Sequence, residues 1–327
     1  MMLPTALDIY EARRRLAPHL QPTPLLPSHW LSSIADGSVF LKIESLNLSN
    51  SFKIRGALNA ALRLIEPADD GAPVSPRDLT IVTASAGNHG RALALAAERL
   101  GMACVVFTPA GAPEAKKNAI RRHGAVLHGE CDDYDAAEKQ ARQYAVAEGA
   151  VYVSPYNHPD VIAGAGTIGL EIVEAMAGFD VVVIPLGGGG LASGMGLALK
   201  AAAPRVTIVG VEVEASSPFT LSLEAGRITE ITPRQSLADG LTGNIEAGSI
   251  TFPLVKQVVD YIVTVSEDDL ARAMKGLATE ERLIVEGAGA AATAAIMAGK
   301  ASAPGQRVVT MISGSNVDLP KWLFTIS

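Results

Sequence analysis

Short runs of β-branched residues alternate with alanine-rich stretches of helical length through most of this chain. The first series has strand and helix candidates at 78–85, 90–101, 103–109, 113–124, 125–130, 132–149 and 150–155. The second series has candidates at 166–178, 180–186, 190–203 and 205–214. Strand–helix alternation predicts parallel sheets with helices on both faces, and the strands are apolar enough to be buried on both sides. We therefore expect an α/β fold with two open, twisted, mostly parallel sheets flanked by helices.

Composition and charge exclude several classes of protein. The formal net charge of −7 argues against a nucleic-acid partner or an anionic membrane surface. The longest apolar run is interrupted by four consecutive glycines, so no segment predicts a membrane span. The N-terminal residues lack the apolar core of a secretion signal, and two cysteines are too few for a disulfide framework. These features indicate a cytoplasmic protein of one or two packed domains.

Four consecutive glycines, Gly187 to Gly190, follow the apolar strand at 180–186 and precede a stretch with helical pattern. Consecutive glycines allow the backbone to approach a ligand closely. The N-terminus of the helix behind them favours an anion such as a phosphate. A flexible connector is the alternative interpretation, but flexibility alone rarely requires four glycines directly after a buried strand. The sequence therefore predicts an anion-binding loop.

Two other glycine-rich stretches resemble the motif of a dinucleotide-binding site. GAGTIG at 164–169 fits the G-x-G-x-x-G pattern, and GAGAAA at 287–292 approaches it. Neither follows a clean strand through a tight turn, which that site requires. We interpret both as places where helices pack closely. No G-x-x-x-x-G-K-[ST] pattern occurs, so a nucleotide P-loop is not supported.

Two polar turns follow strand candidates. SAGNHG at 85–90 opens a helix, so Ser85, Asn88 and His89 can offer donors to a carboxylate or a ring oxygen. An ordinary helix cap is the alternative interpretation. ISGSNVD at 312–318 is a similar turn after the strand RVVTM.

The motifs SFKIRGA, SAGNHG, GGGGL, ADGL, VEGAGAAA and SGSNVD occur in this order between about Thr23 and Asp318. Their order and spacing resemble fold-type II pyridoxal-phosphate (PLP) enzymes of the threonine/serine dehydratase and serine racemase group. The resemblance implies a fold like the tryptophan synthase β subunit. It also implies a large PLP-binding domain from 1–50 and 157–327, a smaller mobile substrate-side domain from 51–156, and a homodimer. Lys53 lies at the junction of the two domains.

The resemblance assigns a role to each motif. Lys53 is implied as the lysine that forms the Schiff base with PLP, and Phe52 would pack against the cofactor ring. Asn88 would hydrogen-bond the ring hydroxyl, and Ser313 would face the pyridine nitrogen. The cofactor phosphate would be bound by the backbone amides of Gly187, Gly188, Gly189, Gly190 and Leu191. The substrate carboxylate would be bound by the turn formed by Ser85, Ala86, Gly87, Asn88 and His89.

The implied reaction converts a β-hydroxy amino acid (L-threonine, L-serine or 3-hydroxyaspartate) to a 2-oxo acid and ammonia. The Lys53 amine would remove the Cα proton before the β-hydroxyl leaves. A serine at 313 would make the ring a weaker electron sink than a carboxylate would, which favours elimination over transamination. The alternatives on this scaffold are a serine or aspartate racemase and a β-replacement enzyme. Lys53 argues against a non-catalytic binding protein, and the glycine context argues against a nicotinamide dehydrogenase.

Ala86 separates the dehydratase from the racemase. Racemisation needs an acid–base group on each face of Cα, and serine racemases have a serine directly before the Gly-Asn-His of this turn. An alanine cannot transfer a proton, so we expect a dehydratase. Tyr156, Asn157, His158 and His123 differ from what a plain threonine enzyme would have. They either recognise a polar side chain such as that of 3-hydroxyaspartate, or they are packing and surface residues.

Many relatives bind a divalent cation, and here the usual ligand set looks incomplete. Glu212 stands at the glutamate position, but Ser217 and Pro218 stand where acidic residues are usual. A hard cation needs several oxygen ligands, so we predict no conventional metal site. We interpret Glu212 and Glu214 as strand-end surface carboxylates. The chain stops soon after SGSNVD, without room for the C-terminal regulatory domain of biosynthetic threonine dehydratases, so we expect a catabolic or specialised enzyme.

Overall fold

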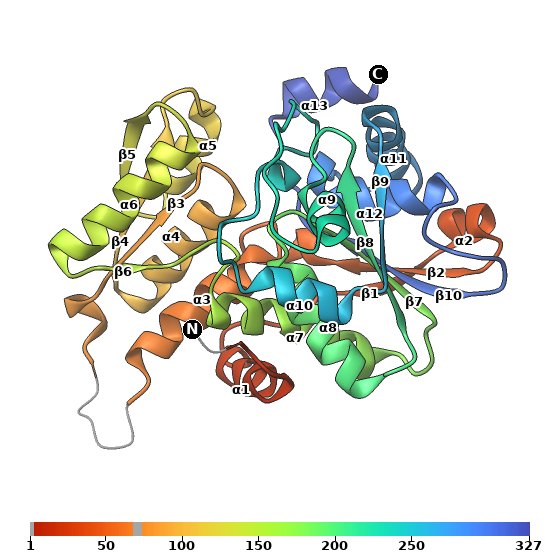
Figure 1. The fold of residues 1–327 in the computed structure, drawn as a ribbon, viewed down its shortest axis with the longest axis horizontal. Helices are drawn as coiled ribbons and strands as arrows, with labels where there is room; N and C mark the ends of the chain where they lie inside the picture. The colour runs from red at the N-terminus through yellow and green to blue at the C-terminus, as the bar shows by residue number, and fades with distance from the viewer. Residues whose placement is uncertain (1–2, 68–73) are drawn as a thin grey trace.

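The computed structural model describes residues 3–67 and 74–327, and its strands form two separate sheets (Figure 1). The larger sheet contains β1 (Leu25–Ser28), β2 (Ser38–Ile43), β7 (Val181–Pro185), β8 (Thr207–Val213), β9 (Tyr261–Val265) and β10 (Arg307–Ile312). The smaller sheet contains β3 (Thr80–Ala84), β4 (Ala103–Pro109), β5 (Val126–Cys131) and β6 (Val151–Tyr152). The strand orders are β1-β2-β10-β7-β8-β9 and β5-β4-β3-β6.

The strands pair in parallel except β1, which is antiparallel to β2. The α-helices are α1 (Ala6–Leu16), α2 (His29–Ala35), α3 (Lys53–Ile65), α4 (Asn88–Leu100), α5 (Glu114–Arg121), α6 (Tyr134–Glu148), α7 (Pro159–Ala175), α8 (Gly190–Ala202), α9 (Pro218–Ala225), α10 (Thr251–Val258), α11 (Glu267–Glu280), α12 (Gly287–Met297) and α13 (Leu319–Ile326). Short 3-10 turns are η1 (Glu44–Leu46), η2 (Pro76–Asp78) and η3 (Asp239–Leu241). The predicted α/β class with two mostly parallel sheets is confirmed.

The central strand β7 is buried along its whole length, as its sequence VVVIP predicts. Its side chains alternate between the two faces of the sheet because successive residues of a strand point in opposite directions. Val181 and Val183 belong to the core formed with the alanines of α12. Val182 and Ile184 belong to the core formed with α7 and α8. Helices therefore cover both faces, and the carboxyl ends of the strands remain for a site.

The two glycine motifs that resemble dinucleotide sites lie within helices. GAGTIG is inside α7, where a Cβ on Gly164 would lie 2.5 Å from the carbonyl oxygen of Arg55 in α3. A Cβ on Gly166 would lie 2.8 Å from the carbonyl oxygen of Gly194 in α8. GAGAAA opens α12, where a Cβ on Gly289 would lie 2.4 Å from the Gly314 carbonyl oxygen. Close packing, rather than a nucleotide, accounts for both motifs, as predicted.

Some element boundaries differ from the expectation. Helix α7 begins at Pro159, seven residues before the predicted start at 166, because proline suits a first helical turn and the His158 side chain accepts from the Asp160 amide. Strand β6 has two residues rather than six. The exposed connection expected at 67–78 lies partly outside the described residues, at 68–73.

The larger sheet and the smaller sheet, each with its flanking helices, form two units, and helix α3 lies between them (Figure 1). Its buried residues, among them Ile54, Leu58 and Ala61, pack with Ile81 of β3 and with α4. Its first residue, Lys53, lies close to the carboxyl end of β10, because the Phe52 amide donates to the Ser313 carbonyl oxygen at 3.0 Å. No helix of the described part of the chain is long and apolar enough to cross a membrane.

Candidate active site

Lys53 begins α3 at the place where the two sheets meet. Its Nζ donates to the carbonyl oxygen of Pro155 at 2.9 Å and lies 5.0 Å from the centroid of the Phe52 ring. A β-bridge between Ser51 and Gly314 fixes the backbone just before the helix. The amine is therefore held by the segment after β6, while its backbone is held by the segment after β10.

The surroundings of Lys53 make its amine less basic than a surface lysine. Burial lowers the pKa of Lys53 to about 8, and the negative charge of Glu286 partly opposes this shift. Burial has this effect because it penalises the charged form of a group. A substantial fraction of the amine is then neutral near pH 8, and the neutral form is the one that acts as a nucleophile or a base.

The four-glycine loop connects β7 to α8, as the sequence predicts. Gly188 packs against the ring of Tyr156, and a Cβ there would lie 2.4 Å from Cγ of that ring. Gly189 has a φ of +86°, and a Cβ there would lie 2.6 Å from Cζ of Phe219. Within the residues that the structure describes, the amides of Gly187, Gly188 and Gly189 donate to no protein acceptor. These free donors at the start of α8 suit an anion.

The polar turn SAGNHG joins β3 to α4. The Gly87 amide donates to Oγ of Ser85 at 3.2 Å, and Asn88 is the first residue of α4. His89 is only 2% exposed, and its Nε2 donates to the Val153 carbonyl oxygen at 3.2 Å. Burial and the positive charge of Lys53 lower the pKa of His89 to about 3, so the imidazole is neutral. A substrate contact by His89 would therefore come from its backbone.

Glu286 is a site residue that the sequence analysis did not single out. It lies directly before α12, and its Oε1 accepts from Nδ2 of Asn88 at 2.6 Å. Burial raises the pKa of Glu286 to about 7, against the hydrogen bond from Asn88, which lowers it. In the sequence it is marked only as a carboxylate inside the motif VEGAGAAA, directly before a helix start, and nothing nearby in the chain identifies Asn88 as its partner.

Ser313 follows β10 and is 4% exposed. Its Oγ donates to the carbonyl oxygen of Ala288 in α12 at 3.3 Å. The hydroxyl is therefore fixed in direction, with lone pairs left to accept a further hydrogen bond.

A continuous series of contacts brings the predicted residues together. Gly188 touches Tyr156, whose neighbour Pro155 accepts from Lys53, and Phe52 beside Lys53 donates to Ser313. Asn88 joins through Glu286, whose charge acts on Lys53. The site thus lies at the carboxyl ends of β3, β7 and β10, where open α/β sheets bind ligands.

Glu212 corrects one interpretation, because it is fully buried rather than a surface carboxylate. Its Oε1 accepts from the Phe219 amide at 2.7 Å, and its Oε2 accepts from the Thr220 amide at 2.9 Å. Both oxygens therefore cap the first turn of α9. Glu214 is exposed, as expected. Within residues 3–67 and 74–327, no three acidic, histidine or cysteine side chains cluster in a way that could hold a metal ion.

Tyr156, Asn157, His158 and His123, which the sequence leaves as either substrate-recognising or packing residues, all have partners within the protein. The Tyr156 hydroxyl accepts from the Glu246 amide at 3.1 Å, and the Asn157 side chain accepts from the Ile250 amide at 3.0 Å. His158 caps α7, and Nδ1 of His123 lies 2.7 Å from a carboxylate oxygen of Glu98. These contacts support the interpretation as packing and surface residues.

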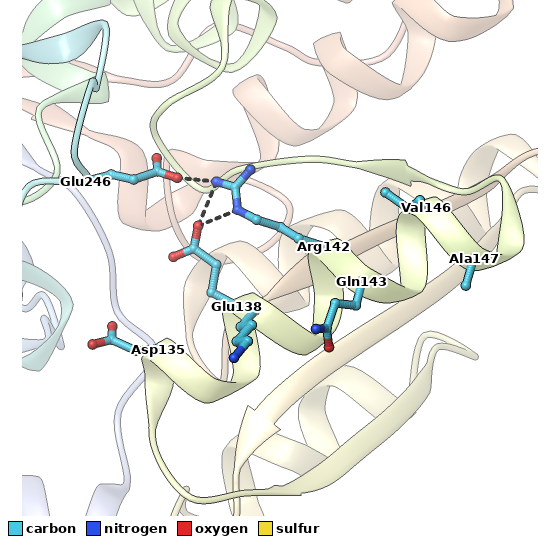
Figure 2. Close-up of a pocket in the computed structure, with 8 residues that line it drawn as sticks. Asp135, Glu138, Arg142, Gln143, Val146, Ala147 and Glu246 are labelled. Carbon is cyan, nitrogen blue, oxygen red and sulfur yellow. Dashed lines mark hydrogen bonds and ion pairs between the residues drawn. The ribbon is translucent and has the colours of Figure 1, made fainter.

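A pocket lies along α6 and is closed at one end by Glu246 (Figure 2). Arg142 there contacts Glu138 at 2.7 Å and also pairs with Glu246 of the larger unit. The Nδ2 of Asn157 donates to the same carboxylate of Glu246. The pocket therefore marks a contact between the two units rather than a second place for chemistry.

The lysine amine, the free amides of the glycine loop, the Asn88 amide and the Ser313 hydroxyl fit a small aromatic aldehyde that carries a phosphate. Fold and site together define the class of PLP-dependent enzymes built on two α/β units. A match of residues 16–314 to the model described as "Pyridoxal-phosphate dependent enzyme" agrees, and the chain belongs to that family.

Within that family, the chain is similar to threonine ammonia-lyases, threonine dehydratases and serine racemases. The chain is 40% identical over 315 residues to the L-threonine ammonia-lyase of Thermotoga maritima, covering 96% of this chain and 76% of that protein. It is 37% identical to the catabolic L-threonine dehydratase of Escherichia coli, covering 98% of this chain and 95% of that protein. Serine racemase from Dictyostelium discoideum superposes with a TM-score of 0.85 at 32% identity, covering 96% of this chain and 99% of that chain.

Proposed function

We propose that this chain is a PLP-dependent ammonia-lyase that converts a β-hydroxy amino acid to a 2-oxo acid and ammonia. The observation that carries the proposal is the partly buried amine of Lys53, with its pKa lowered to about 8 by burial, within the contact network of the glycine loop and Asn88. Similarity to threonine ammonia-lyase and threonine dehydratase over almost the whole chain supports this reaction.

PLP, when bound, supplies an electron sink for the pair left at Cα. The residues of the chain do the rest. Once the substrate has replaced Lys53 on the cofactor, the freed neutral amine would take the Cα proton. The β-hydroxyl would leave as water, so that the Cα proton and the hydroxyl together account for the water lost. The released enamine would tautomerise to an imine, and hydrolysis of the imine would give the oxo acid and ammonia. The amides of the glycine loop hold the phosphate, and the turn from Ser85 to His89 holds the substrate carboxylate.

Elimination is favoured over racemisation by Ala86. A racemase must deliver a proton to the face of Cα opposite Lys53, and a methyl group cannot do so. Ser85 is one residue away, but its Oγ accepts from the Gly87 amide and thus supports the turn. The similarity to a serine racemase structure supports the shared scaffold, and it makes inverted amino acid the product to look for as the second candidate.

We expect threonine or serine rather than 3-hydroxyaspartate as the substrate. Tyr156, Asn157 and His158, which could have recognised a polar substrate side chain, bond to other parts of the protein instead. The test is to incubate the PLP-loaded protein with L-threonine, L-serine and each isomer of 3-hydroxyaspartate, and to measure 2-oxo acid release. We expect strong turnover of L-threonine or L-serine. An intact cofactor spectrum without oxo acid from any substrate would contradict the lyase and favour racemase or β-replacement chemistry.

We also propose a cytoplasmic homodimer in which residues 51–156 move relative to 1–50 and 157–327. Two features support this division: the smaller sheet is built only from strands between Thr80 and Tyr152, and α3 joins it to the larger sheet. Sedimentation equilibrium should give twice the chain mass of 33.9 kDa. A monomer at micromolar concentration would contradict the dimer.

A further inference from the structure

Three side chains form a hydrogen-bonded row that ends at Glu286. Nη1 of Arg91 donates to Oδ1 of Asn316, Nδ2 of Asn316 donates to Oδ1 of Asn88 at 2.6 Å, and Nδ2 of Asn88 donates to Oε1 of Glu286 at 2.6 Å. Nδ2 of Asn316 also donates to the Ser49 carbonyl oxygen at 2.9 Å. The row joins α4, the turn after β10 and the start of α12.

The Arg91 guanidinium and the Ser49 carbonyl group together determine the direction of both asparagine amides in the row. A guanidinium can only donate and a backbone carbonyl can only accept. Arg91 therefore requires the oxygen of Asn316 on its side, and the Ser49 carbonyl requires the nitrogen on the other side. The nitrogen of Asn316 then faces Asn88, which must turn its own oxygen toward Asn316 and its nitrogen toward Glu286.

Asn88 donates one of its two amide N–H groups to Glu286, and among residues 3–67 and 74–327 the second N–H has no acceptor. If the amide were flipped, its oxygen would face the Glu286 carboxylate, and no N–H would be available on that side. The direction of the amide thus decides whether Asn88 can donate to an oxygen on the cofactor ring.

We propose that Asn316, held by Arg91 and by the Ser49 carbonyl, is a positioning residue that fixes the direction of the Asn88 amide, so that Asn88 donates to the ring oxygen of PLP. The inference rests on the proposed function, because it takes the contact between Asn88 and the cofactor from there. Arg91 contributes from one turn along α4, without touching the cofactor.

The test exchanges one atom of the row in the full-length protein. Asn316→Asp keeps the shape of the side chain but removes both N–H donors, while Arg91 pairs with the new carboxylate and compensates its charge. Asn88→Ala removes the contact itself. Asn244→Asp is the matched control, because Asn244 is exposed, lies outside the row, and its side chain bonds to the backbone of Ile231. Each variant is loaded with PLP to measure its dissociation constant and the visible absorption maximum of the bound cofactor, which reports hydrogen bonding to the ring oxygen.

Asn316→Asp should unfold without cofactor within about 3 °C of the parent, weaken PLP binding about tenfold and shift the visible maximum in the same direction as Asn88→Ala. The double variant should be no weaker than Asn88→Ala alone, since the two residues act through one contact. Asn244→Asp should match the parent. If Asn88→Ala changes affinity and spectrum while Asn316→Asp leaves both unchanged, the inference is overturned and the proposed function stands. If Asn88→Ala leaves both unchanged, the cofactor contact of Asn88 fails, and the inference fails with it.

Discussion

Lys53 and Glu286 are two residues of the site whose pKa values their surroundings shift toward neutral pH. Burial disfavours the charged form of each, so the pKa of Lys53 falls to about 8 and the pKa of Glu286 rises to about 7. The negative charge of Glu286 partly opposes the shift of the Lys53 pKa, and the hydrogen bond from Asn88 partly opposes that of the Glu286 pKa. Near neutral pH the site therefore holds an amine that exchanges its proton readily.

This charge balance predicts how cofactor incorporation depends on pH. Only the neutral amine attacks the PLP aldehyde, so the rate should rise with pH and level off above a midpoint near 8. Glu286→Gln removes a negative charge that raises the pKa of Lys53, so it should move the midpoint to lower pH. The measurement is the growth of visible absorption after mixing PLP with cofactor-free protein at a series of pH values. A midpoint near 10.5, the ordinary lysine value, would contradict the account.

At the scale of elements, α3 is fixed by a buried group of four charges. Arg55 lies two residues after Lys53 and contacts Glu44 of η1 at 2.8 Å and Glu171 of α7 at 2.7 Å. Lys42 of β2 contacts Glu171 at 2.6 Å. Burial alone would raise the pKa of Glu44, but the Arg55 guanidinium overcomes this and holds the pKa below its usual value. The group ties the lysine-bearing helix to the larger sheet.

Breaking this group should cost far more than breaking a surface pair on the same helix. Arg55→Met leaves the buried carboxylate of Glu44 without its ion-pair partner and should lower the free energy of unfolding by about 3–5 kcal/mol. Arg63→Met is the matched control, since Arg63 is half exposed and pairs with Glu66 one turn away. It should cost less than about 1 kcal/mol. Urea unfolding measures both, and equal losses would show that the buried group does not anchor α3.

Local pattern predicted the elements well because each depends on residues that are neighbours in the chain. The strand VVVIP, the glycine loop and the polar turn after β3 carry their own periodicity and turn chemistry. Partners far apart in the chain leave no such pattern. Neither the contact of Asn88 with Glu286 nor the burial of Glu212 under α9 has a local signal. The family resemblance supplied Lys53, whereas Arg91 and Asn316 emerged only from the structure.

At the scale of the whole molecule, the site lies between two units that are joined by α3, by the row from Arg91 to Glu286, and by ion pairs nearer the surface. Lys116 of α5 pairs with Asp239 of η3, and Arg142 of α6 pairs with Glu246. Both pairs are partly exposed and are worth little individually. These two outer pairs therefore oppose movement little, and we propose that the units close over a bound amino acid and exclude water.

The central claim is that the chain is an ammonia-lyase that uses Lys53 as its base. The most direct test compares the amounts of oxo acid, ammonia and inverted amino acid formed with and without Lys53. The PLP-loaded parent and its Lys53→Ala variant are incubated with L-threonine and L-serine, and 2-oxo acid, ammonia and inverted amino acid are quantified together. The account predicts equal amounts of oxo acid and ammonia from the parent, almost no inverted amino acid, and a loss of activity of at least about a hundredfold in the variant. Inverted amino acid as the main product, or full turnover by Lys53→Ala, would contradict it.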